Sequence, residues 1–421
     1  MFKNIKFKIF YILLIVILVG QGAFSQENAL ELTLEEAIAT ALNQNLELQS
    51  EKAQIPIGEA GVAKANAIPN PEFFSIYAVG RNTDDLIGIN QIFELGFKRK
   101  ARKNVALAKL NVISSEVEQK AWELRNKVKL AFINLYIAQE KIKANQKIIE
   151  NTKKLREIAQ KRETAGKIPY TDLLQAESEL LKAQTQLENA EIELKQAQTE
   201  LIPLLNLPSA IQIQAVKLES SLGINEIITD NPDYKQETCI EELQKIAYSS
   251  RPELKIIETK KNVAKKEIIL AKKNRIPDLE LGAGIARINP ESNQDLLLQA
   301  NFDIPIWYRQ QGEIKEAEKT IDKLGIDENA LKKNIEAEVR KNFLDVSRLR
   351  FNLYQYDKKI IPVENEIIEK TRIRYELGKD PLVISLTAQK SYFDIVIEYL
   401  NILKDYHDSI SRLEYSIGKP I

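Results

Sequence analysis

The chain has 421 residues, and its 60 basic and 60 acidic residues cancel, so no single-sign field exists that would recruit nucleic acid. Cys239 is the only cysteine, His407 the only histidine and Met1 the only methionine. These counts exclude a disulfide framework, a zinc cluster and a catalytic histidine dyad. The sequence also contains no phosphate-binding glycine loop and no nucleophile elbow. We therefore expect a protein that is not an enzyme and that uses no cofactor and no metal site.

The first 25 residues have the features of a secretory signal peptide. Three lysines precede an unbroken apolar run, Ile9–Val19, which is too short to span a bilayer comfortably. Ala23 and Ser25 have the small-residue spacing that a signal peptidase needs, so the mature chain is expected to begin at Gln26. An uncleaved anchor is the alternative. Cys239 lies too far away to carry a lipid at the mature N-terminus.

Short elements recur in the same order in two halves of the chain, which indicates a duplicated unit. The two glycine turns, and likewise the two terminal prolines, lie 212 positions apart. The matched elements are Thr33–Glu36 with Thr238–Glu241, Asn45–Leu48 with Arg251–Leu254, Ile68–Pro69 with Ile276–Pro277, Gly166–Pro169 with Gly378–Pro381, and Pro208 with Pro420. The first pair is predicted to be two capping boxes, each of which opens a helix. We expect a first repeat at 26–210, a linker at 211–237 and a second repeat at 238–421.

Each unit is predicted to contain a helix, two strands, a very long helix, a tight turn and a final helix. Gly166 and Gly378 suit the left-handed end of a helix, and Pro169 and Pro381 suit the first turn of the helix that follows. The helices are predicted at 34–67, 98–165 and 170–205 in the first unit, and at 241–275, 311–377 and 382–417 in the second. Kinks are expected at Pro56 and Pro362. A helix over 98–165 would be about 100 Å long. The two shorter helices of each unit together equal the long one, so we expect them to lie end to end beside it. The matched lengths would place both tight turns at one end of the bundle, opposite the strands.

The final helix of each unit has a heptad pattern typical of coiled-coil packing. Leucines recur every seven residues from Leu173 to Leu201, and alanines from Ala176 to Ala197. In the second unit the matching positions run from Ser385 to Leu413 and include a ladder of three tyrosines: Tyr392, Tyr399 and Tyr406. Packing between helices is favoured for this ladder over lining a tunnel. His407 is predicted on the helix surface, and Cys239 is predicted to be a structural thiol in the first turn of a helix.

The strand regions alternate apolar and polar residues over about ten positions, which suits an outer-membrane β-barrel. In the second unit one face is apolar: Leu279, Leu281, Ala283 and Ile285, then Leu296, Leu298, Ala300, Phe302 and Ile304. The first unit is looser, with strands at 73–79 and 86–95. Trp307 and Tyr308 could belong to an aromatic girdle. An amphipathic hairpin on a soluble core is the alternative. Four strands cannot close a membrane barrel, so strands in lipid would require several chains.

The chain resembles the TolC family of outer-membrane efflux proteins, including its metal-efflux (CzcC-like) branch, over the whole mature length. The elements that carry the resemblance are Asn45–Leu48, Arg251–Leu254, Ile68–Pro69, Ile276–Pro277, the turns Gly166…Asp172-Leu173-Leu174…Ala176 and Tyr375…Gly378…Leu386…Ala388, and the unit ends Leu204–Pro208 and Ile417–Pro420. The resemblance implies a mainly α protein with a membrane β-barrel. Three chains, as a homotrimer, would share a twelve-stranded barrel and a twelve-helix periplasmic tunnel.

The resemblance also implies a function and partners. The protein would be a passive duct in the outer membrane of a Gram-negative bacterium, and it would receive substrates from an inner-membrane pump through a periplasmic adaptor. The gate and adaptor contacts would lie at the hairpin tips: Gly166, Lys167, Tyr170, Asp172, Gly378, Lys379 and Asp380. Asp172 would either join a ring of acids or carry ordinary first-turn charge. Ile384 stands at the matching second-unit position, so Asp380 would supply part of the charge or cap the helix.

Two other classes of protein compete with the duct. An exported periplasmic adaptor also uses a helical hairpin, but one hairpin flanked by β-domains is expected there. An exported structural coiled coil would not explain the paired amphipathic strands. The exported substrate cannot be predicted from the sequence.

Overall fold

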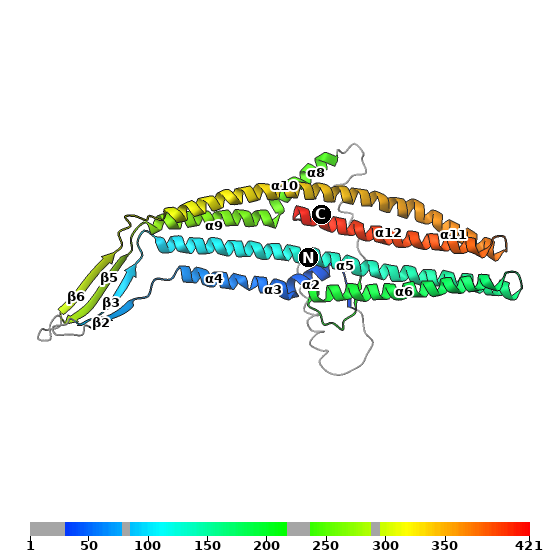
Figure 1. Cartoon of the computed structure of the whole chain (residues 1–421), viewed down its shortest axis with the longest axis horizontal. Helices are drawn as coiled ribbons and strands as arrows, with labels where there is room; N and C mark the ends of the chain where they lie inside the picture. The colour runs from blue at the N-terminus through cyan, green and yellow to red at the C-terminus, as the bar shows by residue number, and fades with distance from the viewer. Residues whose placement is uncertain (1–29, 78–84, 217–235, 288–294) are drawn as a thin grey trace, which may run out of the picture.

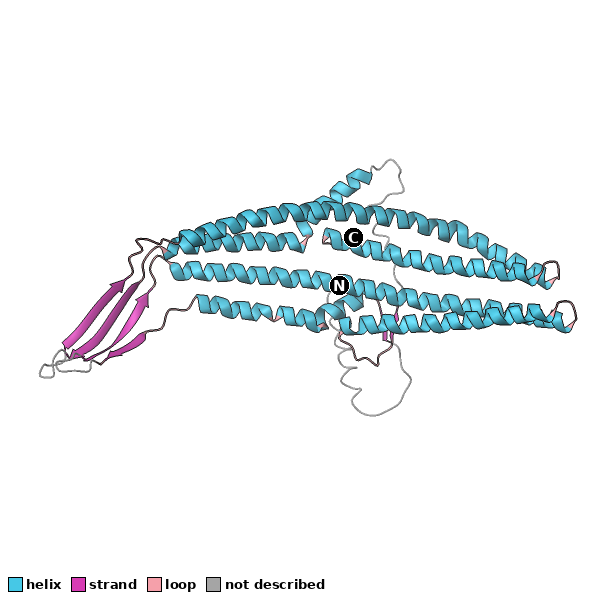
Figure 2. Cartoon of the chain, in the orientation of Figure 1, coloured by secondary structure: helices cyan, strands magenta, loops and turns pink. Residues whose placement is uncertain are grey.

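The computed structural model describes residues 30–77, 85–216, 236–287 and 295–421. The protein is an elongated helical bundle. A small sheet lies at one end, and the two turns that connect helices into hairpins lie at the other (Figure 1, Figure 2). The predicted signal peptide, most of the predicted linker and the tips of both strand hairpins lie outside the described residues. Within these ranges, none of the helices combines the length and the apolar character needed to cross a lipid bilayer.

The first unit follows the predicted order, but its opening helix is divided. The helices are α2 (Leu34–Gln44), α3 (Leu46–Lys52), α4 (Gln54–Ala65), α5 (Lys98–Thr164) and α6 (Tyr170–Leu205). Thr33 caps α2 in the predicted capping box with Glu36. The predicted kink at Pro56 is confirmed as the break at Ala53, in the turn before the proline, and a further break, which was not predicted, falls at Asn45. Pro56 lies in the first turn of α4, where its missing N–H costs no hydrogen bond within that helix.

The break at Asn45 has a counterpart in the second unit. The Asn45 Oδ1 accepts a hydrogen bond from the Leu48 amide at 3.0 Å, which starts α3. In the second unit α8 (Gln236–Ser250) and α9 (Pro252–Asn274) meet at Arg251, so the predicted single helix over 241–275 is wrong. Pro252 forces the residue before it out of the helical region. Thr238 lies inside α8 rather than before it, so the second predicted capping box is wrong too.

The long second-unit helix is interrupted where the sequence predicts a kink. It comprises α10 (Gln311–Gln355), a π-helical turn η1 (Tyr356–Ile360) and α11 (Ile361–Glu376), followed by α12 (Leu382–Ile417). Pro362 lies in the first turn of α11 and cannot donate a hydrogen bond to the preceding turn. The wider π turn absorbs this missing bond. The long first-unit helix, α5, has no such interruption over its 67 residues.

The four strands form one antiparallel sheet in the order β2–β3–β5–β6. They are β2 (Glu72–Ile76), β3 (Asp85–Phe93), β5 (Leu279–Arg287) and β6 (Asp295–Phe302). The register places Phe73, Ile89, Ala283 and Leu298 in one row across the sheet, on the face that carries the alternating apolar residues of β5 and β6. The predicted alternation is therefore confirmed for β5 and β6. In β2 and β3 apolar residues lie on both faces, because Phe74, Ile76, Leu86 and Ile92 belong to the opposite face, in agreement with the looser pattern of the first unit. Ile304 lies beyond the end of β6, where Pro305 removes a strand amide.

The packing of helices agrees with the predicted end-to-end arrangement. α2, α3, α4 and α6 lie along α5, and α8, α9 and α12 lie along α10 (Figure 1). The two units join side by side, because α5 also contacts α9 and α12. Buried residues form four clusters along the bundle rather than one globular core.

A short parallel strand pair near the middle of the bundle has no counterpart in the sequence predictions. β1 (Leu30–Leu32) pairs with β4 (Ile213–Ala215), which lies inside the predicted linker. The Gln198 side-chain amide donates to the Ile213 carbonyl at 3.1 Å and ties β4 to α6. Segments of three residues are too short for alternation to be recognised.

The heptad prediction holds along α6 and α12, with one error. The α6 alanines Ala176, Ala183, Ala190 and Ala197 are all buried. Tyr392 is buried too, which supports packing for the tyrosine ladder. His407 is only 5% exposed, so its predicted surface position is wrong. It lies on the side of α12 that packs on α5. The heptad pattern predicts only one packed face of the helix, so this additional packed face could not be recognised from it.

Candidate functional site: the two hairpin tips

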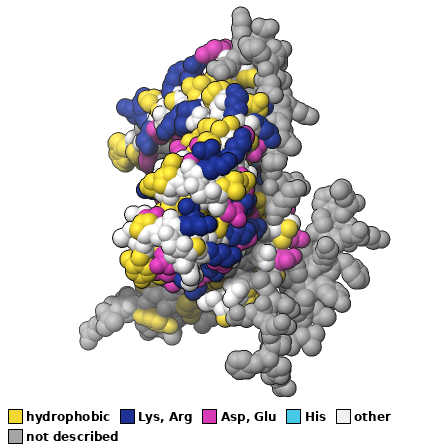
Figure 3. All heavy atoms as spheres, turned by 90° about the vertical axis from the view of Figure 1, so that its right-hand side faces the viewer, with side chains coloured by type: hydrophobic (Ala, Val, Ile, Leu, Met, Phe, Trp, Pro, Cys, Tyr) yellow, Lys and Arg dark blue, Asp and Glu magenta, His cyan; other side chains and the backbone are white. Residues whose placement is uncertain are grey.

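Both hairpin turns lie at the end of the bundle opposite the sheet (Figure 1). This placement agrees with the prediction that matched helix lengths bring them together. Seen from that end, the molecule shows many Lys and Arg side chains interspersed with apolar ones (Figure 3). All seven predicted tip residues lie in this region.

The first turn joins α5 to α6 through a tight helix C-cap. Gly166 has φ of 67°, a left-handed conformation that costs glycine little. The Lys167 amide donates to the Arg162 carbonyl and the Gly166 amide to the Glu163 carbonyl, both at 2.8 Å. This pair of bonds is the Schellman motif. Pro169 occupies the N-cap of α6, one position before the predicted first turn.

The second turn repeats this geometry between α11 and α12. Gly378 has φ of 73°. The Lys379 amide donates to the Arg374 carbonyl and the Gly378 amide to the Tyr375 carbonyl, both at 2.9 Å. Pro381 occupies the N-cap of α12. The predicted left-handed glycines are thus confirmed in both turns, and the two tips are structural copies.

An apolar cluster holds the two tips together. Leu155 and Ala159 of α5, Leu173 and Ala176 of α6, and Tyr375 and Leu382 of the second hairpin form it. Tyr375 is fully buried, and its hydroxyl has no hydrogen-bond partner among the described residues. Burial raises the pKa of Tyr375, Arg162 opposes this rise, and the charge of Asp172 adds to it.

Arg162 makes a polar contact between the two hairpin tips. Its Nη1 donates to the Tyr375 carbonyl at 2.6 Å, and its guanidinium lies over the Tyr375 ring, 4.7 Å from the centroid. The backbone bond and the cation–π contact both cross from α5 to α11. Sequence reasoning missed Arg162, although an arginine stands four positions before each tip glycine.

The equivalent arginine of the second tip makes a different contact. Arg374 binds the Asp380 carboxylate with two bonds, Nε to Oδ2 at 2.6 Å and Nη2 to Oδ1 at 2.8 Å. Arg374 lowers the pKa of Asp380, and Asp380 raises the pKa of Arg374. The suggestion that Asp380 caps α12 is wrong, because Pro381 is the N-cap and Asp380 is committed to Arg374.

The other predicted tip residues are accessible. Gly166, Lys167, Tyr170, Gly378 and Lys379 are exposed, and Asp172 is half-buried in the first turn of α6. Among the described residues, no group of three or more His, Cys, Asp or Glu side chains could hold a metal ion. The tips therefore present charge, one exposed aromatic ring and a shared apolar interior.

Comparisons with known proteins agree with this architecture. A family model described as outer membrane efflux protein matches residues 37–207 and 243–419. The cobalt-zinc-cadmium resistance protein CzcC of Cupriavidus metallidurans is 25% identical over 406 residues, which cover 94% of this chain and 92% of that protein.

Solved channels share the fold at low sequence identity. The fold is similar to that of CusC, with a TM-score of 0.74, 17% identity and 95% of each chain covered. It is also similar to the open state of the Neisseria gonorrhoeae MtrE outer membrane channel, with a TM-score of 0.70, 15% identity, and 95% of this chain and 94% of that chain covered. Because the family model spans most of both halves, the chain belongs to the outer membrane efflux protein family, the TolC family of non-enzymatic outer-membrane channels that form part of tripartite efflux systems.

Proposed function

We propose that three copies of this chain assemble into one passive duct, closed in the membrane by their pooled strands. The support comes from the sheet, in which β2 and β6 each pair on one side only within the described residues. An open strand edge is not tolerated in lipid, and pairing β6 of one copy with β2 of the next removes all such edges. The apolar sheet face then contacts lipid, and the polar face lines the lumen.

This arrangement is tested with two neighbouring substitutions in β6. Leu298→Arg places a charge on the apolar face and should destabilise the assembled barrel by about 2–4 kcal/mol at the bilayer midplane. Gln299→Arg is the matched control, because residue 299 points to the other face, where it pairs with Gly282. Heat-resistant trimers on gels of outer-membrane extracts report the effect. Equal loss from both substitutions would contradict the proposed orientation.

We further propose that the hairpin tips are the periplasmic gate and that Arg162 holds it closed. The observation that carries this is the contact of Arg162 with Tyr375, because it connects the two hairpins of one chain across the tip. The second hairpin is the part expected to move. It is interrupted by the π turn η1, and α11 has only one buried residue, Tyr375.

The gate is tested by removing each arginine in turn. Arg162→Ala should raise the conductance of purified trimers in planar bilayers, since the tips lose their polar link. Arg374→Ala is the matched control: it stands at the equivalent position but binds Asp380 within its own tip. Unchanged conductance in the Arg162 variant, with trimers intact, would argue against a latch at this contact.

The tips are also proposed to dock a periplasmic adaptor that couples the duct to an inner-membrane pump. Support comes from the exposed residues Lys167, Tyr170 and Lys379 at the end remote from the sheet. Reversing Lys167 and Lys379 to Glu should weaken co-purification of the adaptor without altering trimer yield. A double variant that still retains its adaptor would place the docking surface elsewhere.

We propose divalent metal ions as the cargo, on the basis of the relative with cobalt-zinc-cadmium resistance. The chain itself has one histidine, one cysteine and a single methionine, Met1, so selectivity for soft metals would rest with the pump. Deleting the gene should lower tolerance to zinc, cobalt or cadmium. Sensitivity to organic drugs with unchanged metal tolerance would favour a drug pump instead.

We also propose that residues 1–25 are removed on export, leaving repeats at 26–210 and 238–421 and a linker at 211–237. The two family-model matches, 37–207 and 243–419, fall inside these repeats and support the division. N-terminal mass analysis of outer-membrane material should find Gln26 at or near the start. A retained segment before Gln26 would undermine the export proposal.

A further inference from the structure

Aromatic and basic residues gather at the junction between the sheet and the helices. These residues are Phe97, Arg99, Lys100, Lys273, Trp307 and Arg309, which we call the junction belt. They come from three of the connections that join strands to long helices: the start of α5, the end of α9 and the segment before α10. The belt therefore lies where the apolar sheet face ends.

The aromatic members of the belt continue the apolar sheet face. Trp307 is 88% exposed and Phe97 is 77% exposed, so most of each ring is open to its surroundings. Phe97 follows the last residue of β3, Phe93, by four positions, and Trp307 follows the last residue of β6, Phe302, by five. If the sheet lies in a membrane, both rings therefore lie near the membrane surface.

The basic members of the belt carry uncompensated charge. Arg99, Lys100, Lys273 and Arg309 form no ion pair within the described residues, and all but the half-buried Lys273 are exposed. The Lys273 ammonium lies 5.9 Å from the centre of the Phe97 ring, so charge and aromatic surface are adjacent.

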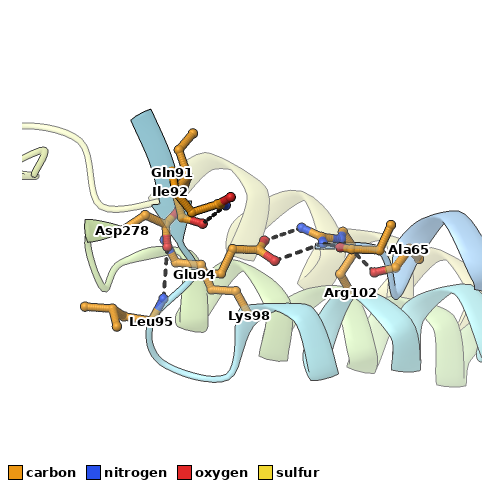
Figure 4. A network of polar contacts seen from close by, with 9 residues as sticks. Ala65, Gln91, Ile92, Glu94, Leu95, Lys98, Arg102 and Asp278 are labelled. Atoms are coloured by element: carbon orange, nitrogen blue, oxygen red, sulfur yellow. Dashed lines mark hydrogen bonds and ion pairs between the residues drawn. The ribbon is translucent and has the colours of Figure 1, made fainter. Parts of the chain in front are cut away.

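Two acids at the junction, Asp278 and Glu94, are committed to basic residues outside the belt. Asp278 binds Lys98 at 2.8 Å and accepts the Leu95 amide at 3.2 Å, and Glu94 binds Arg102 through both oxygens (Figure 4). Arg102 also donates to the Ala65 carbonyl at 2.8 Å. This inner network fixes the sheet on the helices. Of the other acids nearby, Glu313 accepts a hydrogen bond from the Tyr308 hydroxyl and Asp303 is exposed, and neither forms an ion pair with the belt within the described residues.

Helix stability does not account for the belt charges at the start of α5. The first turn of α5 contains no acidic residue, and positive charge at a helix N-terminus opposes the helix dipole. An external anion would relieve this repulsion. Arg and Lys beside Trp and Phe at the edge of an apolar surface are the combination that membrane interfaces favour.

We propose that the junction belt binds the anionic phosphate headgroups of the phospholipid leaflet that faces the periplasm. This inference rests on the proposed membrane position of the sheet. The belt would fix the depth of the channel in the membrane and hold the strand–helix junction at the headgroup level. Removing the four charges should lower the preference of the channel for anionic lipid by at least about tenfold and by up to several hundredfold, since each of the four basic residues contributes about fivefold at such a surface.

The depth of the belt is tested with the natural tryptophan. The chain has two tryptophans, so Trp122→Phe leaves Trp307 as the single emitter. In full trimers reconstituted into vesicles, phosphatidylcholine brominated near the headgroup end of its chains should quench Trp307 more than lipid brominated near the chain terminus. Quenching by neither lipid would overturn the position of the belt at the membrane surface.

Lipid choice is tested with a matched pair of quadruple variants. In the belt variant, Arg99, Lys100, Lys273 and Arg309 become Gln. The control carries Gln at four exposed lysines outside the belt that form no ion pair: Lys153, Lys265, Lys341 and Lys390. Native mass spectrometry of trimers from mixed phosphatidylcholine and phosphatidylglycerol vesicles should show enrichment of phosphatidylglycerol in the wild type and the control, and loss of enrichment in the belt variant.

The outcomes separate the inference from the proposed function. Wild-type trimers that insert normally but retain both lipids equally would overturn the belt and leave the duct intact. Wild-type protein that inserts into neither vesicle would overturn the proposed barrel, and the belt with it. Inorganic phosphate should compete weakly with phosphatidylglycerol; competition at equal concentration would identify a soluble-anion site and overturn lipid binding.

Discussion

Helices α6 and α12 occupy the same place in the two repeats, yet one is peripheral and the other central. Each has 36 residues, starts after a proline N-cap and ends at a left-handed C-cap residue. Seven residues of α6 and fourteen residues of α12 are buried. The repeated sequence therefore determines the length and ends of the helix but not how much of it is buried. α6 packs mainly on α5, whereas α12 contacts α10, α11 and α5.

The difference shows how a duplicated chain acquires an inside and an outside. α12 carries buried polar residues, His407 and Glu414 among them, on the face that meets α5. α6 instead exposes Leu174, Leu181 and Ile192, which are the residues available to a neighbouring copy in the proposed trimer. Helix α12 thus packs against both units of one chain, whereas α6 has exposed apolar residues for contact between copies in the proposed trimer.

The strongest test of this comparison is the buried ion pair between α5 and α12. Lys129 Nζ lies 2.6 Å from Glu414 Oε2, and both side chains are about nine-tenths buried. Lys129→Ala should cost about 3–5 kcal/mol, because it leaves a buried carboxylate without its partner. The free energy of unfolding in urea, measured on detergent-solubilised protein, reports the loss.

The pair between α5 and α6 supplies the control for this prediction. Lys141 lies 2.9 Å from Glu193, at a more exposed site. Lys141→Ala should cost about 0–1 kcal/mol. Replacing Lys129 and Glu414 together by Met and Leu should recover most of the lost stability. Similar losses at Lys129 and Lys141 would mean that α12 is no more central than α6.

The second prediction compares α6 and α12 at two leucines that are equally buried. Leu201 of α6 and Leu413 of α12 lie 212 positions apart and are both fully buried, in separate clusters. Each Leu→Ala substitution should cost about 2–5 kcal/mol through lost burial and a cavity. The two unfolding curves should shift by similar amounts, and a much smaller shift for Leu201 would show that α6 is only loosely attached.

The third prediction concerns pH. Burial, and then the charge of Lys129 on α5, lower the pKa of His407 to about 4. Below its ordinary value of about 6.5 the unfolded chain takes up a proton that the folded chain refuses, so stability falls as pH decreases from about 6.5 to 4. The loss from this group should total about 3 kcal/mol.

The pH dependence is checked by comparing variants, because other groups titrate in the same range. The neighbouring Asp408 is one of them, since burial raises its pKa. His407→Gln should flatten the stability profile between pH 6.5 and 4. Lys195, the α6 position that matches His407, is exposed, and Lys195→Gln should leave the profile unchanged. A His407→Gln profile parallel to wild type would contradict the burial of this ring.

The smallest expected effect on stability compares the two tips. Gly166→Val and Gly378→Val should each cost about 1–2 kcal/mol, because both positions are left-handed. A Cβ at 166 meets nothing within 4 Å, but one at 378 lies 3.5 Å from Arg162 Nη2. Efflux should fall while trimers still assemble, and more for Gly378→Val. Full efflux with both glycines replaced would count against a functional tip.

Much of the architecture follows from local sequence, for physical reasons. The long helices, the glycine–proline turns and the strand alternation depend on hydrogen bonds and side-chain periodicity within a few residues. Accordingly the bounds of α5, α6 and α12 agree with the predictions to within a residue. The helix breaks at Asn45 and Arg251 were missed, although both segments were recognised as repeated elements.

Other features depended on contacts between distant segments, and only the tertiary structure decided them. The placement of α12 between α10 and α5 buried His407 and paired Lys129 with Glu414, 285 positions apart. Arg162 contacts Tyr375 of the other hairpin, whereas Arg374 binds Asp380 of its own, although each arginine precedes the same kind of turn. A repeated sequence sets equivalent local structure twice, but two copies packed side by side have different neighbours, and those neighbours determine burial, charge pairing and the polar link at the tips.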